Sequence, residues 1–257
     1  YLHILFVGFA GMAFYNVLGG ILRGLGDSVS SLVYLLIACG LNIFLDIWFV
    51  AGFEMGVAGV ALATVIAQAI SAVLCAVKLF SMKHLFDIKP ELMRLEKKYA
   101  GSIIKLGVPS GVTQAIFSTS MILVQALTNS FGELMIAANV IVMRIDGFAM
   151  MPNFSFGTAL TTYAGQNVGA GRLDRVKEGA KQGTIMALGV STAITLVLIF
   201  FGKYLMMIFT DTPELIERAA KMLRILAVGY IAMAVLQSLA GVMRGAGDTV
   251  RPMWVSI

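Results

Sequence analysis

Seven long apolar stretches, separated by short polar ones, dominate the sequence. They cover residues 1–24, 29–51, 56–79, 102–130, 134–166, 183–209 and 213–244, and an eighth opens near 250. A helix needs about 20 residues to cross the roughly 30 Å of hydrocarbon in a bilayer, and each of the seven is long enough. The two-residue alternation of membrane β-strands is missing. The pattern therefore predicts an all-α, polytopic helical membrane protein.

Composition and charge support the same class of protein. Hydrophobic residues make up 59% of the chain and charged residues 13%, against roughly 25% charged residues in an average soluble domain. The net charge is +5, but the basic residues gather in the polar segments 80–101 and 166–182, as the positive-inside rule predicts for cytoplasmic loops. We therefore expect a multi-pass monomer of the plasma (inner) membrane, surrounded by the lipid bilayer, with no nucleic-acid partner.

An internal repeat joins the two ends of the chain at a constant offset of 221 residues. Its clearest part is the sequence Arg-Gly-x-Gly-Asp, which occurs at 23–27 and again at 244–248. Such a repeat indicates two structural halves, each about as long as the offset. A chain of 257 residues holds little more than one period, so we expect the natural protein to be longer.

The repeated turn carries an Arg and an Asp in each half, namely Arg23 with Asp27 and Arg244 with Asp248. Residues four apart share one face of a helix, whereas the intervening glycines favour a turn. Two interpretations stay open. The charged residues form a cytoplasmic gate that breaks and remakes during transport, or they anchor a helix end at the membrane interface.

One acid lies inside the first three apolar stretches, and polar residues accompany it. Asp46 follows Asn42 by four residues, Asn16 lies in the preceding stretch, and Thr64 and Gln68 lie in the following one. Ionisable groups inside a membrane are costly and usually functional. Carboxylate, amide and hydroxyl oxygens suit a hard monovalent cation such as Na⁺, and the same carboxyl can carry a proton. The alternative is a buried polar cluster that fixes helix packing. Beyond this cation we expect no metal and no cofactor.

The second half places a different pair of charges in mid-membrane. Arg144 and Asp146 are two residues apart, so they point to different faces of one helix. Either a central cavity receives Asp146, which then attracts cationic compounds, or neighbouring helices neutralise both charges. Gln237 occupies the position equivalent to Asn16. We assign Asp146, Arg144, Gln237 and Gln68 to the lining of a substrate cavity.

Several motifs, taken in order, resemble those of the MATE multidrug exporters. They are LRGLGD at 22–27, LNIFLD at 41–46, GVAGVALATVIAQ at 56–68, LGVPS at 106–110, MPNFSFGTAL at 151–160 and GQNVGAGRLDRV at 165–176. The resemblance implies a twelve-helix transporter with two lobes related by a pseudo-twofold axis. Residues 1–79 then form the second half of the N-lobe with three transmembrane helices, 80–101 a cytoplasmic linker, and 102–257 a truncated C-lobe with four helices and the start of a fifth.

The family also implies a role for the polar cluster. Its exporters carry an Asn, an Asn-x-x-x-Asp and a Thr on successive helices, and these line a cation or proton site together with an Asp from the family's first helix, which we expect to lie outside this chain. Asn16, Asn42, Asp46 and Thr64 match that pattern. The implied function is a secondary antiporter that exports organic, often cationic and amphipathic, drug-like compounds by alternating access, driven by a Na⁺ or H⁺ gradient.

Three rival functions have less support in the sequence. A lipid-linked oligosaccharide flippase of the same superfamily should line its cavity with several basic residues, and Arg144 is the clearest mid-membrane cation. An intramembrane enzyme needs a nucleophile with a base, or metal ligands, within the spans, and the sequence offers neither. A channel is the third rival, and the twofold repeat favours a carrier over it.

Overall fold

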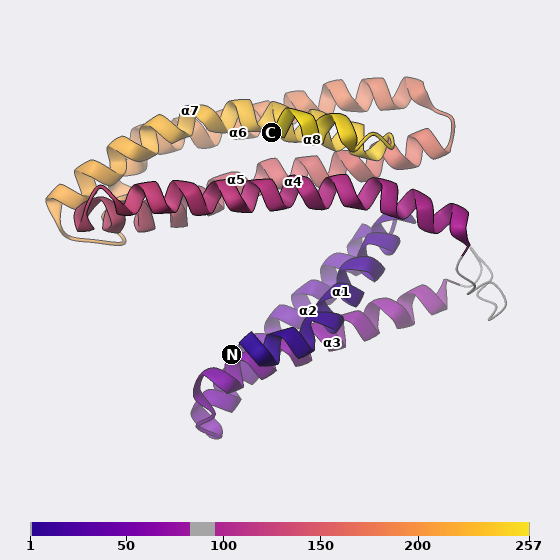
Figure 1. The fold of residues 1–257 in the computed structure, drawn as a ribbon, viewed down its shortest axis with the longest axis horizontal. Coiled ribbons are helices and arrows are strands. Elements are labelled where there is room, and N and C mark those ends of the chain that lie inside the picture. The colour runs from indigo at the N-terminus through magenta and orange to yellow at the C-terminus, as the bar shows by residue number, and fades with distance from the viewer. Residues whose placement is uncertain (1, 83–95, 257) are drawn as a thin grey trace. The chain divides into compact units, whose positions relative to one another are not determined.

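The computed structural model describes residues 2–82 and 96–256, and these residues form helices without any strand (Figure 1). In chain order they are α1 (Leu2–Gly24), α2 (Ser28–Ile47), the π-helix η1 (Trp48–Gly52), α3 (Gly56–Ser81), α4 (Lys97–Asn129), α5 (Glu133–Gly169), α6 (Leu173–Met206), α7 (Pro213–Gly245) and α8 (Val250–Ser256). The all-α prediction is confirmed.

Within the described residues, six helical stretches are long and apolar enough to cross a membrane. They run from α2, which continues through η1, to α7. Helix α1 has 23 residues and extends about 35 Å at 1.5 Å per residue. The prediction of a multi-pass helical membrane protein is confirmed.

Contacts within the chain divide it into two compact units, Tyr1–Leu95 and Glu96–Ile257. In the first unit α3 packs against both α1 and α2, and its core includes Tyr15, Leu22 and Cys75. In the second unit α5, α6 and α7 pack against one another around a core rich in alanine and branched aliphatic side chains.

Small residues bring α5 and α7 into backbone contact. Gly241 and Gly245 are four residues apart on α7, the spacing that allows close helix approach in membranes. A Cβ atom on Gly241 would overlap the carbonyl oxygen of Gly157, and one on Gly245 would overlap that of Thr161. The Thr161 hydroxyl also shares its proton between the Gly157 carbonyl of its own helix at 2.8 Å and the Gly241 carbonyl of α7 at 3.0 Å. The α5–α7 contact therefore depends on glycine at both positions.

The non-helical connections between the helices are shorter than the polar segments predicted, where the structure describes them. The segment 166–182 was expected to be a loop, but α5 continues to Gly169 and α6 already begins at Leu173. Likewise α4 begins at Lys97, inside the expected linker 80–101, of which residues 83–95 lie outside the described residues. Hydropathy marks the part of a helix inside hydrocarbon, whereas a polar helix can continue into water with its backbone groups still paired. Side-chain pairs one turn apart, such as Gln182 with Glu178 at 2.8 Å, support such extensions.

Candidate functional sites in each unit

The repeated Arg-Gly-x-Gly-Asp sequence ends one helix and begins the next in the same way in both units. In the first unit the Gly26 amide donates to the Arg23 carbonyl at 3.1 Å and the Asp27 amide donates to the Leu22 carbonyl at 2.9 Å. In the second unit Gly247 and Asp248 repeat both bonds at 3.1 and 2.9 Å. This is the Schellman cap, which needs a left-handed residue, and the two glycines have φ of 94° and 91°.

The aspartate of each turn then caps the following helix. Asp27 is the N-cap of α2 and accepts from the Ser30 amide at 3.0 Å and the Ser30 hydroxyl at 2.8 Å. Asp248 accepts in the same way from the Arg251 amide at 3.1 Å. The glycines therefore form a turn and do not continue the helix. The choice between a gate and a helix anchor stays open.

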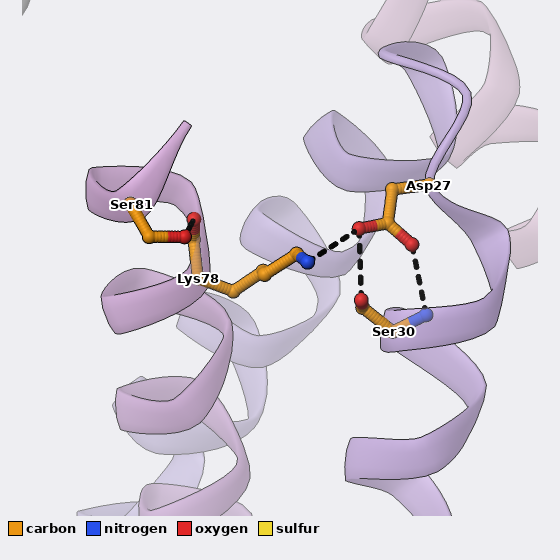
Figure 2. A network of polar contacts seen from close by, with 4 residues as sticks. All are labelled: Asp27, Ser30, Lys78 and Ser81. Carbon is orange, nitrogen blue, oxygen red and sulfur yellow. Dashed lines mark hydrogen bonds and ion pairs between the residues drawn. The ribbon is translucent and has the colours of Figure 1, made fainter. Parts of the chain in front are cut away.

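The charges of the turn do not pair along one helix face. The Asp27 carboxylate forms its ion pair with Lys78 of α3 at 3.3 Å (Figure 2), while Arg23 donates to the Ser31 hydroxyl at 3.0 Å. The hydrogen bonds from Ser30 lower the pKa of Asp27 below its ordinary value, and Lys78 adds to the effect. Asp27 thus ties the start of α2 to the end of α3. Nothing in the sequence of the turn itself pointed to Lys78.

In the first unit, the structure joins two members of the predicted ion-binding cluster. The amide nitrogen of Asn42 on α2 lies 3.4 Å from the Thr64 hydroxyl oxygen on α3. That hydroxyl uses its own proton on the Val60 carbonyl at 3.0 Å. The carbonyl oxygen of Asn42 thus accepts no hydrogen bond from described residues and is available to a ligand.

Two further oxygens of this cluster are buried without a partner. Asp46 Oδ1 on α2 and Gln68 Oε1 on α3 accept no hydrogen bond within the described residues. Asp46 follows Asn42 by one turn and lies two residues before the π-helix η1, a distortion that is frequent at functional sites. Leaving a buried carboxylate oxygen unpaired is costly, which makes Asp46 Oδ1 a candidate ligand.

A pocket of about 230 Å³ between α1 and α3 reaches this cluster. Thr64 and Gln68 line it together with Met12 of α1. Asn16, the fourth predicted residue, is exposed and donates to the Met12 carbonyl of its own helix at 2.8 Å. The structure does not join Asn16 by a hydrogen bond to the other three residues.

In the second unit, Asp146 lies against α7. The Tyr230 hydroxyl donates to Asp146 Oδ1 at 2.7 Å, and the Tyr230 carbonyl accepts from Ser191 at 2.9 Å and Asn153 at 3.2 Å. Tyr230 therefore connects α5, α6 and α7. Arg144 is exposed on α5, so the two charges point to different faces, as their spacing predicts. Sequence reasoning missed Tyr230, since a lone tyrosine 84 residues from its partner gives no local signal.

The other two predicted residues of the second unit, Gln237 and Arg244, line one pocket of about 330 Å³. Helices α4, α5, α7 and α8 form its walls. The guanidinium of Arg244 lies beside α5, since its Nη2 would be 3.6 Å from a Cβ on Gly157. Arg244 thus points into the helix bundle.

Comparison with known proteins agrees with this architecture. The sequence profile of the MatE family matches residues 1–48 and 109–257. The probable multidrug resistance protein YpnP of Bacillus subtilis is 31% identical over 247 residues, which are 96% of this chain and 55% of that protein. The probable multidrug resistance protein NorM of Thermotoga maritima is 26% identical over 260 residues, covering 100% of this chain and 56% of NorM. The chain thus spans a little over half the length of these relatives.

Solved structures share the fold. A crystal structure of MATE in the bent conformation superposes with a TM-score of 0.91 at 23% identity, over 100% of this chain and 57% of that one. An outward-facing multidrug resistance MATE transporter of the MOP superfamily superposes with the same score and identity, over 99% of this chain and 57% of its own. The profile match covers most of the sequence, and the helical architecture agrees with it: the chain belongs to the MatE family.

Proposed function

We propose that the chain is part of a secondary active antiporter that exports organic compounds. A Na⁺ or H⁺ gradient drives the export, and the coupling ion binds at Asp46. The observation that carries this proposal is the buried, unpartnered Asp46 Oδ1 beside the Asn42–Thr64 hydrogen bond. Membership of the MatE family and relatives named as multidrug resistance proteins support export as the activity.

The chemistry of the cluster suits exchange between a proton and a cation. A proton on Asp46 neutralises the buried oxygen, and a sodium ion replaces that proton with coordination from nearby oxygens. Because both ligands use one carboxyl, they compete. Either ligand changes the charge buried between α2 and α3, which gives a gradient a means of shifting the conformation of the lobe.

Rocking of two lobes around a central cavity would complete the transport cycle. Asp146 is the candidate for contact with cationic compounds, and such a contact would compete with its hydrogen bond from Tyr230. A flippase for lipid-linked sugars has less support, since Arg244 is the one charged residue lining the pocket between α4, α5, α7 and α8.

The test is drug efflux from vesicles reconstituted with the protein expressed from its own gene, under an imposed Na⁺ or H⁺ gradient. Asp46→Asn should abolish gradient-driven efflux, because asparagine cannot titrate and is a weaker cation ligand. It should spare equilibrium drug binding and membrane insertion, since it removes an intramembrane charge.

Glu54→Gln is the matched control, because Glu54 is an exposed acid just beyond η1. It should pump at the parent rate. If Asp46→Asn also pumps at the parent rate under both gradients, Asp46 is a packing residue and the proposed coupling site is wrong.

A further inference from the structure

The pocket of the second unit contains a basic side chain without a counter-charge. Arg244 makes no hydrogen bond or ion pair with the described residues, although its guanidinium is half-buried. No acid lines the pocket, and Asp248 nearby is paired with Arg251 at 3.3 Å. A guanidinium carries five N–H donors and is charged at all physiological pH values, so this one calls for an acceptor.

The internal repeat shows which hydrogen-bond partner Arg244 lacks. In the first unit the equivalent Arg23 donates to Ser31 at 3.0 Å. The offset of 221 residues places Pro252 at the position of Ser31. Proline offers no side-chain acceptor, and Pro252 lines the pocket beside Arg244. The same helix-ending arginine thus has a side-chain acceptor in the first unit and none among the described residues in the second.

The remaining polar groups of the pocket favour the same kind of ligand. Its hydroxyl protons are already used on backbone carbonyls: Ser110 donates to Leu106 at 2.9 Å and Thr113 donates to Pro109 at 3.0 Å. The side-chain amides of Gln114 and Gln237 form no hydrogen bond with described residues and line the pocket. Arg244 and these two amides supply N–H donors, which suit a ligand rich in acceptors.

We propose that this pocket binds an anionic group, such as a carboxylate, sulfonate or phosphate, with Arg244 as its counter-charge and an apolar body against the rest of the wall. Phe117, Phe154 and Leu236 supply that apolar wall. A charge-assisted, two-pronged contact from arginine is the strongest common way to hold such a group. This binding depends neither on export nor on the coupling ion at Asp46.

The test is calorimetric titration of the full-length protein, purified in a neutral maltoside detergent, with decyl sulfate and with decyltrimethylammonium as a chain-matched cation. The parent protein should bind the sulfate and prefer it over the cation. Arg244→Gln should weaken sulfate binding about tenfold or more, the effect of losing one charged hydrogen bond. Arg224→Gln is the control, because Arg224 is an exposed arginine on the same helix that does not line the pocket, and it should bind like the parent.

A second variant keeps the charge and restores the missing partner. Pro252→Ser should let a hydroxyl accept from Arg244, as Ser31 does from Arg23, and should weaken sulfate binding several-fold while thermal unfolding shows a folded protein. Equal sulfate affinity of Arg244→Gln and parent, or equal affinity of the parent for sulfate and cation, would overturn the proposal.

Phosphatidylglycerol added to phosphatidylcholine nanodiscs distinguishes the two sources of such a group. If it weakens sulfate binding to the parent but not to Arg244→Gln, the natural occupant is a lipid headgroup. If it has no effect on the parent, the pocket takes a free organic anion.

Discussion

Replacement of Gly241 by alanine tests how the second unit is held together. The new Cβ would overlap the Gly157 carbonyl oxygen on α5, so the two helices must move apart. That movement would also strain the hydrogen bond from Thr161 to the Gly241 carbonyl, now 3.0 Å long. The substitution therefore acts on the closest part of the α5–α7 contact.

The expected magnitude is a difference of two effects. Alanine favours a helix interior over glycine by about 1 kcal/mol, whereas an extra methyl group in a tightly packed contact costs typically about 1–3 kcal/mol. The difference is a loss of about 0–2 kcal/mol. We expect Gly241→Ala to lie in the upper half of this range, at about 1–2 kcal/mol, because overlap with a backbone oxygen cannot be relieved by a side-chain rotation.

The internal repeat supplies a matched control. Gly20 of α1 is the equivalent of Gly241. The atom nearest to a Cβ built on Gly20 is Arg23 Nη2 at 3.9 Å, at the end of a flexible side chain. Gly20→Ala should therefore be neutral or stabilising by up to about 1 kcal/mol. The assay is unfolding in mixed maltoside and dodecyl sulfate micelles, followed by far-UV circular dichroism. Equal stability of the two variants would refute the argument from close helix contact.

Three further predictions concern two contacts and the expected orientation of the chain. Asp27→Ala should lower the free energy of unfolding by about 1 kcal/mol near neutral pH through loss of the N-cap. Because the pKa of Asp27 is lowered in the folded state, the stabilisation by its carboxylate is present above the ordinary pKa of 3.8 and is lost as the pH falls through the lowered pKa. Acid titration of the parent and the variant should therefore show their stabilities converging. Tyr230→Phe should cost about 1–3 kcal/mol by leaving Asp146 without its donor, whereas unchanged stability would mean that water replaces the hydroxyl. Single cysteines at Ser81 and Arg172, in a variant whose own cysteines are replaced, should react with an impermeant thiol reagent only after right-side-out vesicles are opened; reaction in sealed vesicles would contradict a cytoplasmic location. Arg172 is preferable to Gly171 for this purpose, because Gly171 has a φ of 70°.

The sequence was most informative where one physical requirement dominates. A bilayer requires long apolar helices, so the spans from α2 to α7 follow from hydropathy alone. The ends of α4 and α6 do not, because they extend into polar sequence that hydropathy cannot assign. The sequence shows that the turn at 23–27 is repeated. It does not show that the turn is a Schellman cap followed by an N-cap, because glycine allows the backbone angles of that cap but also allows others.

The candidate site was partly readable for a similar reason. Helical spacing puts Asn42 and Asp46 on one face, and in the structure the Asn42 side chain donates to the Thr64 hydroxyl of the next helix. The role of these residues in ion coupling stays a prediction. Contacts such as Tyr230 with Asp146, or Lys78 with Asp27, join helices far apart in the sequence. Only the packed structure reveals them.

Comparison of the two units separates what the repeat preserves from what it has changed. Both retain the capped turn and the arginine before it, since a helix must end and restart at the same place in each unit. The side chains around that arginine are not retained, because Ser31 corresponds to Pro252 and Asn16 to Gln237. Among the described residues, Asp46 Oδ1 of the first unit is buried without a partner, and the half-buried Arg244 of the second unit lines a pocket that contains no acid. The backbone frame is therefore shared by both units, while the opposite charges support the different ligands that we propose for them: a cation or proton in the first and an anionic group in the second.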